Sequence, residues 1–344
     1  MLMIQVHKDS LVIDSHNDLI VAHIRRGNQS ISDDPKPDRI RHSGTVSFLR
    51  GLLSEDQRKQ EVQASFSKLR AGGINAVFCA VDVTMAWKNH LAYALDAFGY
   101  FRAEIEDNNH QVTIVKSASD IRRAKEDGKV AIVLVIENSE AIERSLNILA
   151  MLHEIGVRSI GLTHNLNTWA ATGVYESDSG GTLTQFGVQL VKEMNRLGML
   201  IDVSHISETS FWNVLEVSEC PIIASHSNCK AICDHARNLT SEQIKHIAQN
   251  QGSIGVTFVE SFIERDKSRQ TLDRLIDHVD YIVDLVGIEY VGIGSDFDGG
   301  GDLLTDATEY PRITEKLTQR GYSDADIGKI LGENHLRVFE AACG

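Results

Sequence analysis

Apolar residues along this chain fall into short unbroken runs that alternate with segments of helical spacing. The run Val130–Ile136 contains no polar side chain, which is typical of a parallel strand buried on both faces. Other segments place apolar residues three or four positions apart, as at Leu190, Met194 and Leu197 before Gly198. This spacing predicts amphipathic helices that end at glycine. The alternation of strands and helices predicts an α/β fold with a parallel sheet.

The full pattern contains eight or nine strands with helices between them. The predicted strands lie at residues 12–18, 74–81, 112–115, 130–136, 159–163, 199–204, 221–225, 253–258 and 290–295. The predicted helices run from Ser54 to Gly72-Gly73, over residues 90–107, 119–127, 140–155 and 272–286, and from Thr184, Ser207 and Ser241. Right-handed crossovers and this number of strands favour a closed (β/α)8 TIM barrel over an open sheet. Eight strands are enough for such a barrel, and the short run at 112–115 is the one that could be left out.

The chain shows no linker and no break in composition, so we expect one barrel domain over residues 1–344. A polar stretch from about Arg25 to Gly51 contains Asp33-Asp34-Pro35-Lys36-Pro37, which is typical of a loop. This stretch is either a plain surface loop or a lid over a functional site.

Charge and composition narrow the class of protein. The net charge of −14 argues against nucleic acid or an anionic membrane surface as a partner. No segment approaches the roughly 20 apolar residues that span a bilayer, and the first residues lack the pattern of a signal peptide. The five cysteines form no even framework and are expected to be reduced thiols. We therefore expect a cytoplasmic protein.

The residues that follow six of the predicted strands are imidazoles and carboxylates. They are His16, Asp18, Glu137, His164, His205, His226 and Asp296. A TIM barrel carries its chemistry at the carboxyl ends of its strands. One strand-end histidine has an ordinary structural explanation. Six such strands would each place a costly polar group in the barrel mouth unless the groups share a partner, and a metal centre would be that partner.

Imidazole and carboxylate ligands fit Zn²⁺, with Mn²⁺ or Co²⁺ as alternatives. Side chains two positions apart on an extended chain point the same way, so we assign His16 and Asp18 to one ion. We assign His205 and His226 to a second ion. Glu137 can bridge the two, because a carboxylate has two oxygens.

Two adjacent cations lower the pKa of a shared water and polarise a carbonyl. Asp296 is then the candidate general base, and it could later protonate a leaving amine. His164 is the candidate donor to the developing oxyanion. Asp14 and Asp202 are expected to support the ligands rather than to bind metal. Asp298, beside two glycines, is expected to be a turn residue.

Longer motifs surround these residues. They read Asp14-Ser-His-Asn-Asp18, Gly161-Leu-Thr-His164-Asn165, Asp202-Val-Ser-His205, Ser225-His226-Ser227, His235-Ala-Arg237-Asn238 and Gly294-Ser-Asp296-Phe-Asp298-Gly299, with a further stretch at 330–339. This ordered set resembles the membrane (renal) dipeptidase family of zinc peptidases, within the amidohydrolase superfamily. The similarity spans nearly the whole chain.

The resemblance implies a binuclear site with two Zn²⁺ per chain, a dipeptide substrate and a homodimer. The ligands implied by matching motifs are His16, Asp18, Glu137, His205 and His226. The resemblance also implies that His164 contacts the scissile carbonyl, that Arg237 grips the C-terminal carboxylate of the dipeptide, and that Asp296 handles the proton. The family accepts a D-residue in the second position. An ordinary salt bridge is the alternative role for Arg237, and His235 is either a support or a substrate contact.

The sequence departs from the family around the substrate pocket. Asn138-Ser139 stand where the family usually has glycine-like residues, and His153 and Ser159 replace two tyrosines. The segment at 78–83 lacks the tyrosine that contacts the substrate in the animal enzymes. Within this segment, Asp82 either contacts a free amine or is a solvated loop residue.

Two alternatives to a dipeptidase stay open. The same centre could hydrolyse another small amide, such as an N-acyl amino acid or a lactam. The missing tyrosine leaves this alternative open. A non-catalytic binding protein could also retain the fold. The complete ligand set together with Asp296 weighs against that second alternative, because a degenerate copy is expected to lose at least one of these residues.

Overall fold

The computed structural model describes residues 4–25, 31, 48, 51–56, 60–86 and 88–344. Most of the polar stretch predicted at 25–51 lies outside these residues. Nine strands form one sheet in which every pairing is parallel. They are β1 Ile13–Asn17, β2 Ala76–Asp82, β3 Val112–Ile114, β4 Val130–Glu137, β5 Val157–Gly161, β6 Leu200–Asp202, β7 Ile223–Ala224, β8 Ser253–Val256 and β9 Val291–Ile293.

The sheet closes on itself because β2 pairs with β1 on one side and with β4 on the other. Eight strands therefore form the ring, in the order β1, β2, β4, β5, β6, β7, β8 and β9. The short strand β3 adds to the first residues of β4, where Val112 pairs with Val130. The predicted (β/α)8 barrel is confirmed, and the strand at 112–115 is the one outside the ring.

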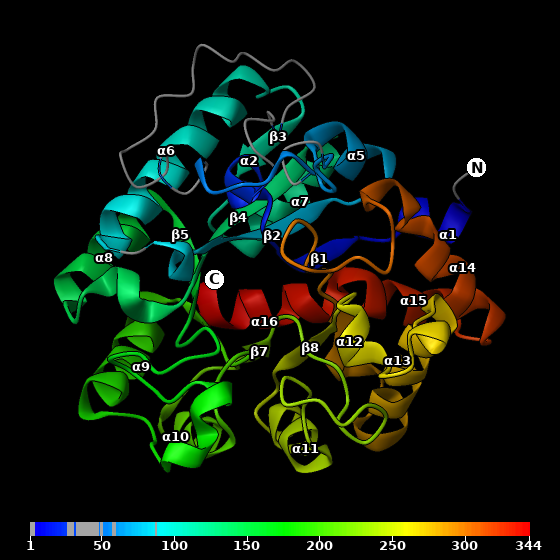
Figure 1. The fold of residues 1–344 in the computed structure, drawn as a ribbon. Helices are drawn as coiled ribbons and strands as arrows, with labels where there is room; N and C mark the ends of the chain where they lie inside the picture. The colour runs from blue at the N-terminus through cyan, green and yellow to red at the C-terminus, as the bar shows by residue number, and fades with distance from the viewer. Residues whose placement is uncertain (1–3, 26–30, 32–47, 49–50, 57–59, 87) are drawn as a thin grey trace.

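Helices surround the ring (Figure 1). The α-helices are α1 Gln5–Asp9, α2 Leu19–Arg25, α5 Phe66–Ala71, α6 His90–Asp107, α7 Ala118–Glu126, α8 Leu146–Ile155, α9 Gln185–Leu197, α10 Glu208–Val217, α11 Ser241–Gln249, α12 Glu260–Ile263, α13 Leu272–Val286, α14 Pro311–Gln319, α15 Asp324–Gly328 and α16 Asn334–Cys343. Short 3-10 helices lie at η2 Val83–Met85, η3 Ser139–Ile142, η4 Val174–Ser179, η5 Lys267–Arg269, η6 Ile288–Tyr290 and η7 Ala307–Glu309, and η8 Lys329–Glu333 is a π-helix. In the part of the chain that the structure describes, no helix has the length and apolar character needed to cross a membrane.

Two predicted helices have other boundaries in the structure. The helix expected from Ser54 onward is not continuous, because residues 60–65 are non-helical and α5 begins at Phe66. The helix expected over 140–155 is split into η3 and α8 by Glu143 and Arg144, whose φ angles are +50° and +59°. The Ser145 side chain then caps α8 by accepting from the Ile148 amide.

The sheet has one core inside the ring and another between the ring and its helices. Along β4, Ala131, Val133 and Val135 pack inside the barrel, while Ile132 and Ile136 pack against the outer helices. The inner core also contains Leu336 and Phe339 of α16, which crosses behind the strands in Figure 1. The alternation of faces along β4 therefore directs its last residue, Glu137, to the inside of the barrel. All five cysteines are free thiols.

Candidate metal centre and active site

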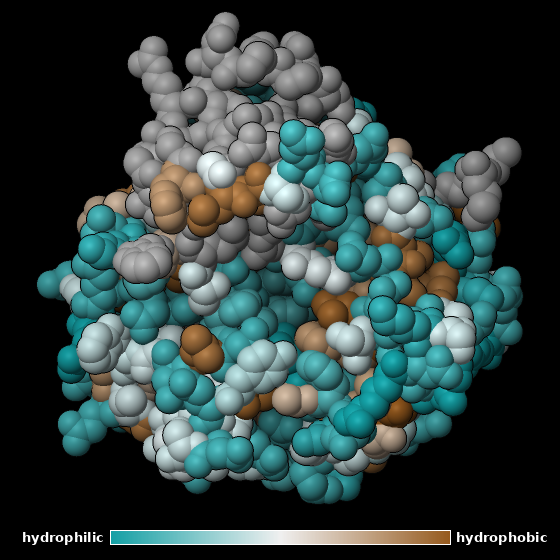
Figure 2. All heavy atoms as spheres, viewed as in Figure 1, coloured by the Kyte–Doolittle hydropathy of each residue, from teal (hydrophilic) through white to brown (hydrophobic). Residues whose placement is uncertain are grey.

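The predicted site residues meet at the carboxyl ends of the barrel strands. Figure 2 shows a hollow lined by hydrophilic residues in the middle of this face of the molecule. The register between β1 and β2 shifts between Asp14 and Asn17, which is the part of β1 that carries His16. Such a shift re-aims a side chain near an active site, and here it allows His16 to join groups from the other strands.

Glu137 lies at the centre of the group. Its Oε1 atom is 3.6 Å from His16 Nε2, 2.9 Å from His205 Nε2 and 3.5 Å from His226 Nε2. Its Oε2 atom is 4.0 Å from Nε2 of His164, whose side chain is 26% exposed. Glu137 therefore faces four imidazoles that come from four different strand ends.

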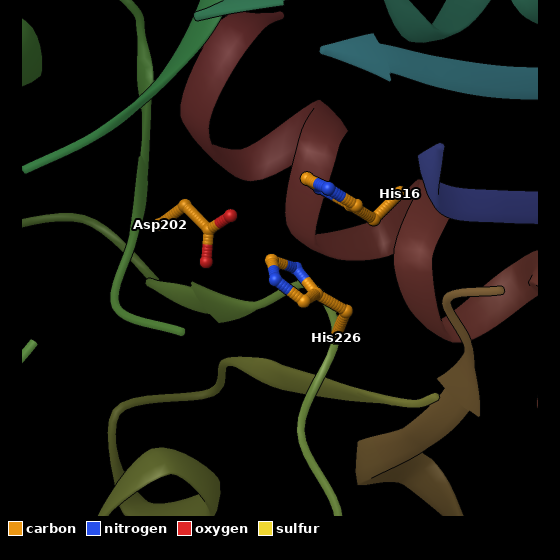
Figure 3. Close-up of side chains that lie close together, drawn as sticks. All are labelled: His16, Asp202 and His226. Carbon is orange, nitrogen blue, oxygen red and sulfur yellow. The ribbon is translucent and has the colours of Figure 1, made fainter. Parts of the chain in front are cut away.

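The remaining acidic groups complete three sets of potential metal ligands. Each set has ligand atoms that all lie within 4.8 Å of one another: His16 with Asp202 and His226, Glu137 with His164 and His205, and His16 with Asp18 and Asp296. Figure 3 shows the first of these sets. Asp296 lies beside Asp18, and its backbone has a φ of +61° in the loop after β9. The structure thus brings together all seven strand-end residues that the sequence singled out.

Burial controls the protonation of this cluster. It lowers the pKa of His205 and of His226 well below the usual value, and nearby Arg237 and His16 act in the same direction. Burial also raises the pKa of Glu137 to about 7, against the opposing effect of His16 and His164. The two histidines are therefore neutral at physiological pH, the state in which imidazole binds a metal.

The histidine rings are oriented by contacts on the side away from Glu137. His205 Nδ1 contacts Asn165 Oδ1 at 2.9 Å, and His226 Nδ1 contacts the hydroxyl of Ser225 at 2.8 Å. The His16 and His226 rings stack with centroids 3.7 Å apart. Each ring thus turns Nε2 toward the carboxylate. His205 Nε2 and His226 Nε2 are only 2.7 Å apart.

This donor set fits a divalent cation of the zinc type. Buried, neutral imidazoles with Nδ1 held by the protein and Nε2 aimed at a shared carboxylate are the usual surroundings of such an ion. The two close Nε2 atoms would both have a partner if they shared a cation. His16, Asp18, Glu137, His205 and His226 would hold the ions.

Arg237 is buried beside the cluster and already has partners in the protein. Its Nη1 donates to the Ser204 carbonyl, and its Nη2 donates to the His226 carbonyl at 3.2 Å. Nε has no hydrogen-bond partner in the described part of the chain. The guanidinium lies over the Phe262 ring, and the Arg237 amide donates to His235 Nδ1 at 3.2 Å. The salt bridge that the sequence left open is not seen among the described residues.

The structure also bears on the expectations for Asp82 and Asp298. Asp82 is only 4% exposed, so it is not a solvated loop residue; it pairs in register with Glu137 and caps η2 by accepting from the Thr84 amide at 2.9 Å. Asp298 has the turn conformation expected, with a φ of +63°. Its carboxylate also accepts from the backbone amides of Gln63 and Ala64. Gln63 had no signal in the sequence that marked it.

A comparison with known proteins identifies the family. The family described as "Membrane dipeptidase (Peptidase family M19)" matches residues 3–343. The chain belongs to the membrane dipeptidase family. It is 34% identical over 322 residues to Dipeptidase verJ of Clonostachys rogersoniana, a match that covers 87% of this chain and 82% of the relative.

Solved structures of metallopeptidases share the fold of this family member. One is a metallo peptidase from Rhodobacter sphaeroides liganded with a phosphinate mimic of the dipeptide L-Ala-D-Ala, with a TM-score of 0.81, 25% identity and coverage of 97% of this chain and 100% of that chain. Another is dipeptidase AC, a metallo peptidase of family M19, with a TM-score of 0.82, 26% identity and coverage of 97% and 99%. Both similarities extend over essentially the whole barrel.

Proposed function

We propose that this protein is a dipeptidase that uses two Zn²⁺ ions held by His16, Asp18, Glu137, His205 and His226. The observation that carries the proposal is the convergence of three Nε2 atoms on Glu137 Oε1, at 3.6, 2.9 and 3.5 Å. Membership of a dipeptidase family supports the substrate class. The ions, when bound, would supply an activated water and a polarised carbonyl.

The chain's own residues then divide the remaining work. Asp296, beside Asp18, takes a proton from the nucleophile and returns it to the leaving amine. His164 stands at the exposed side of the cluster and donates to the oxyanion as it forms. Arg237 binds the C-terminal carboxylate of the dipeptide, for which its guanidinium would exchange at least one of its carbonyl partners.

We further propose that the enzyme accepts a D-residue in the second position. A metallo peptidase of similar structure is liganded with a mimic of L-Ala-D-Ala, which supports this specificity. One domain over residues 1–344, a cytoplasmic location and a homodimer stay predictions. Light scattering of the purified protein would test the homodimer.

The alternative substrate is another small amide, such as an N-acyl amino acid or a lactam. It stays open because the segment at 78–83 has no tyrosine where the resemblance implies a tyrosine that contacts the substrate. Hydrolysis of a free α-amino dipeptide and of its N-acetylated analogue by the same preparation separates the two functions.

The deciding experiment offers L,L- and L,D-dipeptides, each with a free or an amidated C-terminus, to Zn²⁺-loaded protein. Cleavage of the free-carboxylate dipeptides, with D-residues accepted second, is the expected result. Arg237→Ala should raise KM for these substrates and leave that for the amidated ones nearly unchanged. Protein that holds no metal and is not activated by Zn²⁺ would refute the enzyme proposal altogether.

A further inference from the structure

The hydroxyl of Ser225 lies between His16 and His226, two proposed ligands that we assign to different metal ions. It is 2.8 Å from His226 Nδ1 and 3.4 Å from His16 Nδ1. The two rings are stacked, so both Nδ1 atoms lie on the Ser225 side while both Nε2 atoms face Glu137. One serine thus touches the outer nitrogen of a ligand from each half of the centre.

Asp202 determines which way this hydroxyl points. Ser225 Oγ donates to Asp202 Oδ2 at 2.5 Å. The other carboxylate oxygen, Oδ1, already accepts from three donors: the Ser204 amide at 3.0 Å, the Ser204 hydroxyl at 2.7 Å and the Ser225 amide at 3.2 Å. Because a serine hydroxyl has one proton and that proton goes to Asp202, its lone pairs face the imidazoles.

An ion could in principle occupy the space among His16, Asp202 and His226, which lie close together in Figure 3. Ser225 Oγ already fills that space, within 3.4 Å of an atom of each of the three residues. Asp202 has all its hydrogen bonds from Ser204 and Ser225. The geometry therefore makes Asp202 an anchor for Ser225 and not a third metal ligand on this side.

We infer that Asp202 and Ser225 are positioning residues that fix the tautomer of His16 and His226 together. An oxygen that can only accept stabilises the ring form with its proton on Nδ1, which leaves the Nε2 lone pair for a cation. The inference rests on the proposed metal centre. It adds that the affinities of the two ions are linked through a single hydroxyl that touches neither ion.

Two variants test the inference. Ser225→Ala removes the acceptor of both Nδ1–H groups. Asp202→Asn keeps the shape of the side chain but replaces the acceptor that faces Ser225 with a donor. The three donors on Oδ1 hold the amide oxygen at that position, so the amide NH₂ group must face Ser225 Oγ. The hydroxyl then turns its proton toward the imidazoles, which favours the tautomer that cannot bind metal through Nε2. Exchange of an aspartate for asparagine beside a catalytic histidine of serine proteases has the same consequence.

Ser15→Ala is the matched control. Ser15 directly precedes His16, as Ser225 precedes His226, and it is equally buried. Its hydroxyl donates to the carbonyls of Ser225 and Ile293, at 2.7 and 3.0 Å, and makes no hydrogen bond to an imidazole nitrogen in the described part of the chain. The loss of this hydroxyl should lower stability without changing a histidine tautomer.

The measurement is competition for Zn²⁺ against a chromophoric chelator, together with ¹⁵N NMR of the histidine rings in the zinc-loaded protein. We expect Nδ1–H signals for His16 and His226 in the unmodified protein, and a loss of about 10- to 100-fold in the affinity for both zinc equivalents in Ser225→Ala and Asp202→Asn. The inference would be overturned if both variants bind zinc as tightly as the unmodified protein, or if their loss of affinity is no larger than in Ser15→Ala. Weaker binding of only one of the two zinc equivalents would also overturn it. Absence of zinc binding by the unmodified protein would instead refute the proposed function on which it rests.

Discussion

Asp298 and Gln63 hold each other through a reciprocal pair of hydrogen bonds. The Asp298 amide donates to Gln63 Oε1 at 2.7 Å, and the Gln63 amide donates to Asp298 Oδ1 at 2.8 Å. The second carboxylate oxygen of Asp298 accepts from the Ala64 amide at 3.1 Å, and Gln63 Nε2 donates to the Gly301 carbonyl at 3.2 Å. The loop that carries Asp296 is therefore tied to the segment that precedes α5.

These hydrogen bonds predict that Gln63→Ala lowers turnover, although Gln63 is not in contact with the reacting atoms. The variant leaves the buried amide of Asp298 without its acceptor, which costs about 1–3 kcal/mol of stability. Asp296 should shift, and kcat should fall by about tenfold or more, because small misplacements of a catalytic group are costly. Steady-state kinetics and thermal unfolding measure both effects.

Gln111→Ala is the control for that variant. Gln111 is similarly buried and pairs with Arg70 and Asn108 next to the start of β3, at the opposite end of the barrel from the site. It should lose stability and keep its kcat. Equal kcat for both variants would mean that the tie between Gln63 and Asp298 only stabilises the fold.

Gly299 is required by the two carboxylates beside it. A Cβ at this position would lie 2.0 Å from Asp18 Oδ2 and 2.0 Å from Asp296 Oδ1. Gly299→Ala should therefore displace both groups, weaken zinc binding by about 10- to 100-fold and lower kcat. The next residue is a matched control, because a Cβ at Gly300 would meet nothing closer than 3.8 Å. Zinc titration and kinetics should leave Gly300→Ala close to the unmodified protein; if both variants behave alike, the crowding argument is wrong.

The barrel and its strand-end residues could be predicted from sequence because both depend on local pattern. Buried parallel strands are continuous apolar runs such as Val130–Ile136, and the residue after each run faces the barrel mouth. The shared contact of Ser225 with His16 and His226 could not be predicted this way. Asp202 was expected to support a ligand, but nothing in the sequence marks Ser225 until the fold places its hydroxyl beside His16, more than 200 positions away.

The helix expected from Ser54 to Gly72-Gly73 forms only from Phe66, and its non-helical part at 60–65 shows why local pattern fails elsewhere. Val62, Phe66 and Leu69 have helical spacing, but the amides of Gln63 and Ala64 donate to Asp298 instead of continuing a helix. A contact across more than 230 positions thus overrode the local preference. The break at Glu143 and Arg144 had a visible signal, since Ser145 is a good N-cap within the stretch expected to be helical.

Zinc binding should release more protons at pH 6 than at pH 8. In the metal-free protein, burial raises the pKa of Glu137 from 4.5 to about 7, so the group is mostly protonated at pH 6 and mostly ionised at pH 8. A cation requires the carboxylate and reverses this shift. His205 and His226 are neutral at both pH values, because burial lowers their pKa.

The expected difference is therefore about one proton per chain, with zinc affinity falling as the pH drops through 7. Calorimetric titration in two buffers of different ionisation enthalpy counts the protons released. The same number at both pH values would show that Glu137 is already ionised in the metal-free protein.

Asp82 is the residue most suited to discriminate a free amine from an acylated one. It is buried at the end of β2, in register with Glu137, and its carboxylate caps η2. Asp82→Asn keeps the cap, because asparagine caps as well as aspartate, and removes only the charge. If Asp82 receives the substrate's ammonium, the charge-assisted hydrogen bond is worth enough to raise KM for dipeptides by about 10- to 100-fold.

The KM for N-acetylated substrates should stay unchanged in Asp82→Asn, since they have no ammonium to lose. Asp266→Asn is the matched control: Asp266 caps η5 through the Ser268 amide and hydroxyl, as Asp82 caps η2 through those of Thr84, but it is exposed on the surface. Asp266→Asn should change KM for neither the free nor the acetylated substrates. If KM rises equally for free and acetylated substrates in Asp82→Asn, the carboxylate only maintains the structure at the mouth of the barrel. Loss of a contact with the amine would raise KM for the free dipeptides alone.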